Sequence, residues 1–397
     1  MQELHQKTGA PLHSAYALPQ LKVLYESHAP LVQRVSRWHT LSTHCLARWI
    51  AREESWPISS SEASWTGLLS VQHPLTYQSF ALALLPAACR EALPAVIHFD
   101  DLPESLNFRP SYAQRWPHLQ EARIFLGVGD GACANVGSKC ATAHRIACTI
   151  GTSAAARVVV RASEFAQRIP QGLFCYRIDH DHLLLGGALT DGGSVIAWAR
   201  QLLHIQSDKE MQACLAEVDQ LLLRDYAMAA EGNFLQRPLV MLPFLSGERS
   251  TNYQTGATGA IMGLTRATTR IDLLKACLEG VTLRLATIVR LLPPHAPIWV
   301  SGRALEVNTV WRQMLADCTG RTIVLDFDTQ EGSSRGVAVL IDASLRGVDL
   351  EVEMPSASVI EMNPRPEGKW YWARHARTQE SFLEAMKPIY AKNECSE

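Results

Sequence analysis

Three glycine-rich turns, each beside a short apolar segment, limit the folds that this chain can adopt. Gly127-Val128-Gly129-Asp130-Gly131 closes the apolar run 124–128, Gly151-Thr152-Ser153 separates two segments rich in Val, Ile and Thr, and Asp191-Gly192-Gly193-Ser194 opens a helix-like segment. Because glycine has no Cβ, main-chain amides in such turns can approach anionic oxygens closely. Short strands alternating with helices indicate an α/β domain whose ligands gather at these turns.

The segments around the turns have the patterns of hairpins. Residues 145–152 and 156–160 predict one hairpin, because β-branched residues flank a polar turn. Residues 173–178 and 183–189 predict a second hairpin around Asp179-His180-Asp181-His182. These four polar residues raise the question of a metal site, but their spacing provides no convergent ligand set, so a solvated turn is expected.

Two helices are predicted downstream. Apolar residues recur every three or four positions in 270–292, and Thr269 and Asp272 have the spacing of a capping box. The second helix covers 308–319, ends at Gly320 and follows a strand at 298–301.

The first part of the chain is predicted to be mostly helical, over 21–52 and 76–91. The second of these segments places Phe80, Leu84 and Ala87 on one helix face. Residues 100–117 are polar and contain several prolines, and they are predicted to be a linker. The expected organisation is a first unit at 1–120, a second at 121–350, and an extension at 351–397 that ends in a helix.

Length, composition and net charge exclude several classes of protein. The chain has 397 residues, enough for two or three folded units, and its 47% hydrophobic and 19% charged content fits a globular protein. With 37 basic and 39 acidic residues the net charge is -2, so nucleic acid is not an expected partner. No apolar stretch reaches the length of a membrane span, and residues 1–19 lack the apolar region expected of a signal peptide. The ten cysteines, Cys395 among them, form no C-x-x-C pair. A cytoplasmic protein with reduced core cysteines is expected.

Asp130 comes just after the apolar run 124–128, which is predicted to be a short strand, and lies in a glycine turn. It could accept a proton from a substrate hydroxyl during phosphoryl transfer, or it could cap a helix over 132–137. The spacing Gly127-x-Gly129-x-x-Ala132 also matches a dinucleotide fingerprint. That fingerprint needs an acid about twenty residues on for the ribose, yet the next acidic residue is Glu164. The dinucleotide interpretation is therefore set aside.

Taken in order, several blocks resemble the FGGY carbohydrate kinases, a family with the actin-like ATPase (ribonuclease H-like) fold. The blocks, which lie within 120–345, are Gly127-Val-Gly-Asp-Gly131, Thr149-Ile-Gly-Thr-Ser153, Gly186-Gly-Ala188 leading to Trp198, Gly247-Glu-Arg249, Gly259-Ala-Ile-Met-Gly-Leu-Thr265, Leu278-Glu-Gly280, Trp311-Arg-Gln-Met-Leu-Ala-Asp317 and Glu331-Gly-Ser-Ser-Arg-Gly-Val-Ala338. Residues 8–70 look more faintly like the later part of the family's first domain. The resemblance implies two domains around a cleft.

The resemblance also implies roles for individual residues. Asp130 would be the catalytic base and, with Gly131, would contact the substrate. Gly151, Thr152 and Ser153 would hold nucleotide phosphates, Gly193 would lie along the nucleotide, and Gly302 with Asn308 would lie near adenine. ATP and Mg2+ would be the cofactors, with no metal-ligating residue assigned. The substrate would be a sugar or sugar acid, with gluconate or a pentulose favoured, and a homodimer is compatible with the sequence.

The sequence departs from the family pattern in two places. The family opens with an Asp-x-Gly-Thr-type phosphate hairpin, and the chain as given contains no such segment. Beside adenine the family usually has a glycine pair, whereas this chain has Ser301-Gly302-Arg303-Ala304. Two hypotheses follow: a carbohydrate kinase with an incomplete first domain and impaired activity, or a non-catalytic actin-like nucleotide-binding module that acts through a partner chain.

Overall fold

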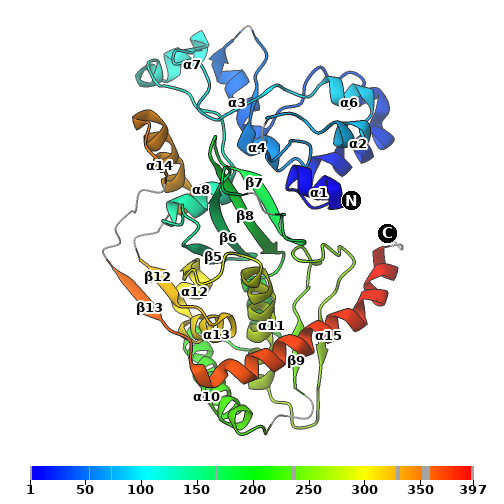
Figure 1. The fold of residues 1–397 in the computed structure, drawn as a ribbon, viewed down its shortest axis with the longest axis vertical. Coiled ribbons are helices and arrows are strands. Elements are labelled where there is room, and N and C mark those ends of the chain that lie inside the picture. Colours follow the sequence, from blue (N-terminus) through cyan, green and yellow to red (C-terminus); the bar gives the residue numbers. More distant parts are fainter. Residues whose placement is uncertain are drawn as a thin grey trace.

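A seven-stranded mixed sheet forms the centre of the computed structural model (Figure 1), which describes residues 2–52, 54–72, 74–165, 168–233, 238–327, 331–350 and 358–394. In spatial order the strands are β13 (Val359–Met362), β12 (Ile323–Asp326), β11 (Ile298–Ser301), β5 (Ile146–Ile150), β6 (Ala154–Arg161), β8 (His182–Leu189) and β7 (Phe174–Arg177). Strands β5, β11 and β12 run parallel, and the other neighbouring pairs are antiparallel. Both hairpins predicted from the sequence, β5–β6 and β7–β8, are confirmed.

The alternation of side chains along β6 separates two cores. Ala154, Ala156 and Val158 face one hydrophobic cluster, and Ala155 and Val159 face the other. The first cluster contains residues of α9 (Gly193–Leu202), α10 (Asp208–Ala230), α11 (Arg270–Arg290), α13 (Thr309–Thr319) and α15 (Lys369–Glu394). The second contains residues of α8 (Asp130–Gly137), α14 (Gly332–Arg346) and the first part of the chain. Helices therefore cover both faces of the sheet.

The two predicted helices form, and their ends lie within two residues of the predicted ones. Thr269 and Asp272 make a reciprocal capping box at the start of α11. Asn308 caps α13 by accepting a hydrogen bond from the amide of Trp311 at 2.9 Å, and Gly320 ends the helix in the left-handed conformation. Trp311 is buried, as expected for a core residue.

Helices α8 and α14 cross with their backbones in contact. A Cβ on Gly137 would lie 1.9 Å from the carbonyl oxygen of Gly332, and one on Gly336 would lie 1.8 Å from that of Cys133. Only glycine permits so close an approach. The glycines of the block 331–338 thus have a packing role beneath the sheet.

The first part of the chain lies beyond one end of the sheet (Figure 1). Its helices are α1 (Gln2–Thr8), α2 (Ala17–Val32), α3 (Leu41–Trp49), α4 (Ser60–Ser64), α5 (Ser79–Ala83), α6 (Ala87–Glu91), α7 (Pro110–Arg115) and the 3-10 turn η1 (Pro117–Leu119). Its strands, which pair as β1–β4 and β2–β3, are β1 (Ile50–Ala51), β2 (Ile58–Ser59), β3 (Val96–Ile97) and β4 (Asn107–Phe108). The remaining elements are the paired strands β9 (Val240–Leu242) and β10 (Ala260–Met262), of which β9 packs on α11 and α15, the helix α12 (Arg303–Val307) beside β11 and α13, and η2 (Pro366–Gly368) before α15.

Three predictions of secondary structure are wrong. The segment 100–117, predicted to be a linker, contains β4 and α7. Residues 76–91 form two short helices, because Pro86 supplies no amide hydrogen and separates α5 from α6. Ala81, Leu85 and Cys89 are buried there, whereas Phe80 and Leu84, predicted on the helix face with Ala87, are exposed.

Residues 124–128 also form no strand in the described structure. A ladder needs a regular neighbouring strand, but here the amide of Leu126 donates to the carbonyl of Phe99, and the hydroxyl of Ser59 donates to the carbonyl of Gly127. The segment is therefore held by isolated contacts.

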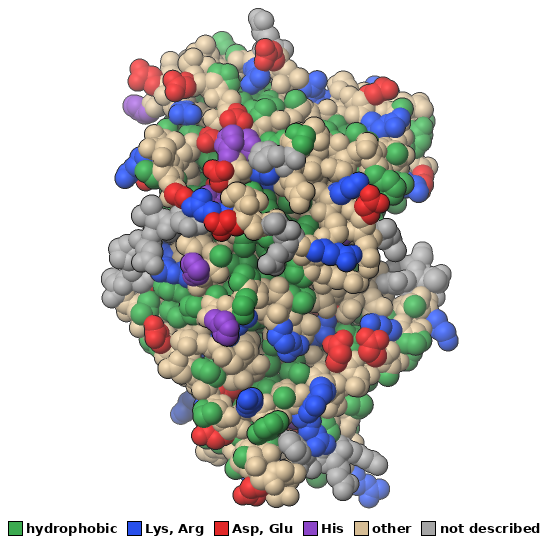
Figure 2. Space-filling model, viewed as in Figure 1, with side chains coloured by type: hydrophobic (Ala, Val, Ile, Leu, Met, Phe, Trp, Pro, Cys, Tyr) green, Lys and Arg blue, Asp and Glu red, His purple; other side chains and the backbone are tan. Residues whose placement is uncertain are grey.

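The nine cysteines that the structure describes are free, and seven of them are buried, as predicted; Cys395 and residues 351–357 lie outside the described residues. Within the described part of the chain, no helix combines the length and apolar character needed to cross a membrane. Figure 2 shows positive and negative side chains interspersed over one face of the molecule.

Candidate active site

The tip of the β5–β6 hairpin presents Gly151, Thr152 and Ser153 to solvent. Its backbone is closed by a hydrogen bond of 2.9 Å from the amide of Gly151 to the carbonyl of Ser153. The hydroxyls of Thr152 and Ser153 have no hydrogen-bond partner among the described residues, and no atom lies within 4 Å of a Cβ built on Gly151. The tip therefore combines exposed hydroxyl donors with an accessible backbone, which suits a phosphate group.

The start of α9 lies directly against this tip. The amide of Gly193 donates to the carbonyl of Gly151 at 2.8 Å, and the amide of Gly192 donates to that of Thr152 at 2.9 Å. A Cβ on Gly193 would lie 2.5 Å from the carbonyl oxygen of Gly151, so a larger residue would force the two turns apart. The glycines that the sequence singled out thus lock the second and third turns together.

Gly302 joins the same group from the end of β11. It has φ +94° at the N-cap of α12, and a Cβ there would lie 2.6 Å from the carbonyl oxygen of Ile150, the last residue of β5. The neighbouring hydroxyls of Ser301 and Thr149 are 2.9 Å apart. Positive φ and close contact both require glycine at this position.

A cavity of about 360 Å³ opens between the starts of α9, α12 and α13 and the side of α10. Among its lining residues are Gly193, Arg303, Ala304 and Asn308. The structure thus brings together, at one cavity, the residues predicted along the nucleotide and near adenine, with Gly302 immediately before Arg303. Its volume lies within the range of small-molecule sites. Arg303 is exposed on its wall, so the cavity stays open despite the departure from a glycine pair.

Asp130 is the first residue of α8, and its side chain is exposed. One carboxylate oxygen accepts a hydrogen bond of 2.6 Å from the amide of Gly131. The turn before it is tied to α4, because the amide of Gly129 donates to the hydroxyl of Ser61 at 3.1 Å. The N-cap itself is Gly129 and makes no side-chain cap. Asp130 thus sits in the first helical turn with a second carboxylate oxygen open to a ligand.

Arg157 is a neighbour of Asp130 that sequence reasoning missed. Its guanidinium carbon lies 3.5 Å from a Cβ built on Gly131. Burial lowers the pKa of Arg157, and the charge of Asp130 opposes that effect. Arg157 lies three residues along β6 from Ala154, or about 10 Å of strand, so one strand links the Asp130 turn to the hairpin tip. The only signal in the sequence is an arginine within the apolar run 154–160.

Glu62 is a second missed residue, near the start of the glycine turn: its carboxyl carbon lies 3.0 Å from a Cβ built on Gly127. Its carboxylate is buried and accepts hydrogen bonds from the hydroxyls of Ser42 at 2.7 Å and Thr40 at 3.1 Å. Burial raises the pKa of the Glu62 carboxyl, although these hydrogen bonds oppose it. In the sequence Glu62 follows three serines, and nothing in this polar run places it near Asp130.

Glu62 and Asp130 both line a larger cavity of about 980 Å³. Most of the other lining side chains are apolar, and they include Trp49, Trp116, Phe125 and Val337. A sugar, which carries many hydroxyls, matches such a lining poorly. The polar side of Asp130, toward Gly131 and Arg157, is the better place for a hydroxylated substrate.

The chain is similar to known proteins in sequence and in fold. Residues 146–343 match the FGGY family of carbohydrate kinases, C-terminal domain. A gluconokinase of Bacillus licheniformis is 24% identical over 348 residues, covering 85% of this chain and 64% of the relative. A xylulose kinase of Klebsiella pneumoniae is 30% identical over 265 residues, covering 64% of this chain and 49% of the relative. The chain thus spans less than two thirds of the length of these relatives.

Solved structures match over nearly the whole chain. A gluconate kinase from Lactobacillus acidophilus has a TM-score of 0.81 at 23% identity, covering 98% of this chain and 76% of that one. A ligand-bound xylulose kinase from the same organism has a TM-score of 0.80 at 23% identity, with the same coverage. The predicted actin-like ATPase fold is confirmed. Residues 146–343 are therefore a C-terminal domain of the FGGY family of carbohydrate kinases, and the chain as a whole has the fold of the solved gluconate and xylulose kinases.

Proposed function

We propose that this chain contributes the catalytic base and the nucleotide site to an ATP-dependent phosphorylation of a hydroxyl group on a sugar or sugar acid. The observation that carries the proposal is the single strand β6. Its first residue follows the exposed hairpin tip, and its Arg157 lies against the Asp130 turn. A phosphate held at the tip and a hydroxyl held at Asp130 would therefore face each other along one strand.

In the proposed reaction the substrate hydroxyl oxygen attacks the γ-phosphorus of ATP. Asp130 accepts the hydroxyl proton through its open carboxylate oxygen, the bond from the γ-phosphorus to the bridging oxygen breaks, and ADP leaves. Gly131 borders the substrate. Arg157 is near enough to the Asp130 turn to balance the negative charge that collects there.

The nucleotide would extend from the hairpin tip into the 360 Å³ cavity. Gly151, Thr152 and Ser153 would donate to its phosphates, Gly193 would run along it, and Gly302 with Asn308 would border adenine. The side-chain oxygen of Asn308 already accepts from the amide of Trp311, so its amide nitrogen is the group left for a base.

Mg2+ would supply charge neutralisation between the phosphates. Both carboxylate oxygens of nearby Asp191 accept protein hydrogen bonds, one from Ser194 and the other from the amide of Ser246. Asp130 keeps one oxygen open. This donor set fits an ion held mainly by phosphates and water, with the open oxygen of Asp130 left for the substrate hydroxyl.

Gluconate is the first substrate we propose, and xylulose the second. The gluconokinases match this chain over 85% of its length, and the xylulose kinases match over shorter stretches. The test is a coupled ADP-release assay with Mg-ATP and gluconate, xylulose, ribulose or glycerol. Sugar-dependent ADP release supports the kinase, and ATP binding without release for any of the four contradicts it.

A second candidate function is a nucleotide-binding module that acts through a partner chain. The apolar lining of the 980 Å³ cavity favours it, since large exposed apolar surfaces mark association sites. This candidate predicts ATP binding without sugar-dependent ADP release by the chain alone. The same assay therefore separates the two candidates.

A further inference from the structure

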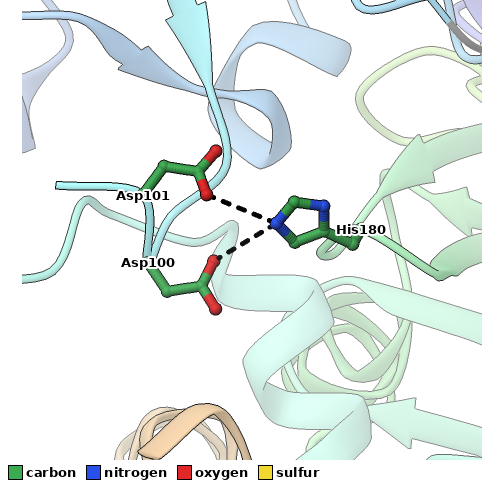
Figure 3. A group of neighbouring side chains, drawn as sticks. All are labelled: Asp100, Asp101 and His180. Atoms are coloured by element: carbon green, nitrogen blue, oxygen red, sulfur yellow. Dashed lines mark ion pairs between the residues drawn. The ribbon is translucent and has the colours of Figure 1, made fainter. Parts of the chain in front are cut away.

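The turn between β7 and β8 brings His180 against two consecutive aspartates from the segment after β3. Its Nε2 lies 3.4 Å from Oδ1 of Asp101 and 3.9 Å from Oδ1 of Asp100. All three atoms lie within 4.8 Å of one another. Figure 3 shows both carboxylates directed at the same ring nitrogen. The convergent ligand set that the sequence of the turn lacked is thus supplied by residues far away in the chain.

Each carboxylate has its other oxygen held by a protein donor. Oδ2 of Asp100 accepts from the hydroxyl of Ser344 at 2.8 Å, and Oδ2 of Asp101 accepts from the amide of His98 at 2.8 Å. These contacts leave both Oδ1 atoms facing His180. Ligating carboxylates in metal sites are commonly oriented in this way by a second layer of hydrogen bonds.

Oδ1 of Asp100 indicates that a ligand belongs in this cluster. The atom is buried, and it has no hydrogen-bond partner in the described structure. At 3.9 Å, Nε2 of His180 is too far away to donate to it. A buried carboxylate oxygen without a donor is costly, and a cation between the three ligand atoms would satisfy it.

The imidazole is held in place on its other sides. Its ring stacks on that of His98, with centroids 3.5 Å apart and planes inclined by 28°. The guanidinium of Arg177 donates to the carbonyls of Asp179 and His180 in the turn. The histidine therefore does not depend on the aspartates alone for its position.

The distances indicate the kind of cation. Tetrahedral Zn2+ with bonds of about 2.0–2.2 Å keeps neighbouring ligand atoms roughly 3.3–3.6 Å apart. The observed 3.4 and 3.9 Å are close to this spacing. One imidazole and two carboxylates suit a borderline cation such as Zn2+, whereas Ca2+ and Mg2+ favour oxygen ligands alone.

We propose that Asp100, Asp101 and His180 bind a divalent transition-metal cation of the Zn2+ type, with water as a fourth ligand. Their side chains are 22%, 41% and 51% exposed, so the cation has access from solvent. The site joins the segment after β3 to the β7–β8 turn of the central sheet. A cation that binds the folded chain and not the unfolded chain would stabilise the fold.

The test is a titration of the full chain, after treatment with EDTA, with Zn2+ by calorimetry and with Co2+ by visible absorption. Wild type is expected to bind one Zn2+ per chain at this site and to give the intense bands of tetrahedral Co2+. Asp101→Asn and His180→Ala should each weaken Zn2+ binding by about tenfold or more. Asp181→Asn, an exposed aspartate in the same turn outside the cluster, should bind like wild type.

Thermal unfolding with and without Zn2+ separates loss of the metal site from loss of the fold. Zn2+ should raise the melting temperature of wild type and Asp181→Asn, and it should leave that of Asp101→Asn and His180→Ala unchanged. Circular dichroism in EDTA checks that all four proteins fold. Equal Zn2+ affinity in wild type and His180→Ala, or no tetrahedral Co2+ bands in wild type, would reduce the cluster to a histidine–aspartate ion contact and overturn the proposal.

Discussion

The carboxylate of Glu248 lies 2.8 Å from the guanidinium of Arg284, and both side chains are fully buried. Glu248 belongs to the Gly247-Glu248-Arg249 block, and Arg284 belongs to α11. Asn252 also donates to Glu248 at 2.8 Å, and Arg284 lies 3.3 Å from the hydroxyl of Thr251. Glu248 thus holds the loop 247–252 against α11, a helix of the first core cluster, which is a structural role.

Removing one member of this pair should be strongly destabilising. Arg284→Met leaves Glu248 buried without its counter-charge, and we expect the free energy of unfolding to fall by about 3–5 kcal/mol. The double variant Arg284→Met/Glu248→Leu should recover much of that loss, because no isolated charge remains. Urea unfolding measures both. A loss below about 1 kcal/mol in the single variant would show that the pair is not what holds the loop.

Glu62 should make stability depend on pH. Its pKa is raised above the ordinary 4.5 by burial, so the folded chain holds this proton more tightly than the unfolded chain does. Its contribution to the free energy of unfolding is therefore fully present below pH 4.5 and declines as pH rises through the raised value. Glu62→Gln keeps an acceptor but cannot ionise, so it should gain stability relative to wild type from pH 4.5 toward neutrality. Urea unfolding of both proteins across that range checks this, and a constant difference would contradict it.

Thr152 should affect nucleotide binding but not folding. Its hydroxyl is exposed and makes no hydrogen bond within the described chain. We expect Thr152→Val to raise the Kd for Mg-ATP by about tenfold or more, the effect of losing one hydrogen bond to a charged group, with an unchanged melting temperature. Thr258→Val, at an exposed threonine in the loop before β10, is the matched control. Calorimetric Kd values that are equal for the two variants would exclude a phosphate contact by Thr152.

Many of the helix ends and hairpins could be predicted from local signals in the sequence. The capping box at Thr269, the helix end at Gly320 and the polar turns between apolar segments depend on neighbours within a few residues, and the structure confirms each. The glycines at 193 and 302 were identified by pattern, and the structure adds their close contacts with Gly151 and Ile150.

The sequence could not predict features that depend on distant residues. Residues 124–128 look like a strand, but strand formation needs a ladder partner, and the contacts they make come from Phe99 and Ser59. Arg157 and Glu62 gain their places near Asp130 only through packing of β6 and α4. The β7–β8 turn looked like a solvated turn because Asp100 and Asp101, which face His180, are far away in the chain.

The role of Asp130 is the central claim. Asn at this position can still accept from the amide of Gly131, so the fold and ATP binding should persist, but it cannot take up the hydroxyl proton. The most direct measurement is sugar-dependent ADP release by wild type and Asp130→Asn with Mg-ATP and gluconate, alongside the Kd for ATP. We expect the rate to fall by about 10²–10⁴-fold at an unchanged Kd. A variant that turns over at nearly the wild-type rate would make Asp130 a residue of the first turn of α8 and nothing more.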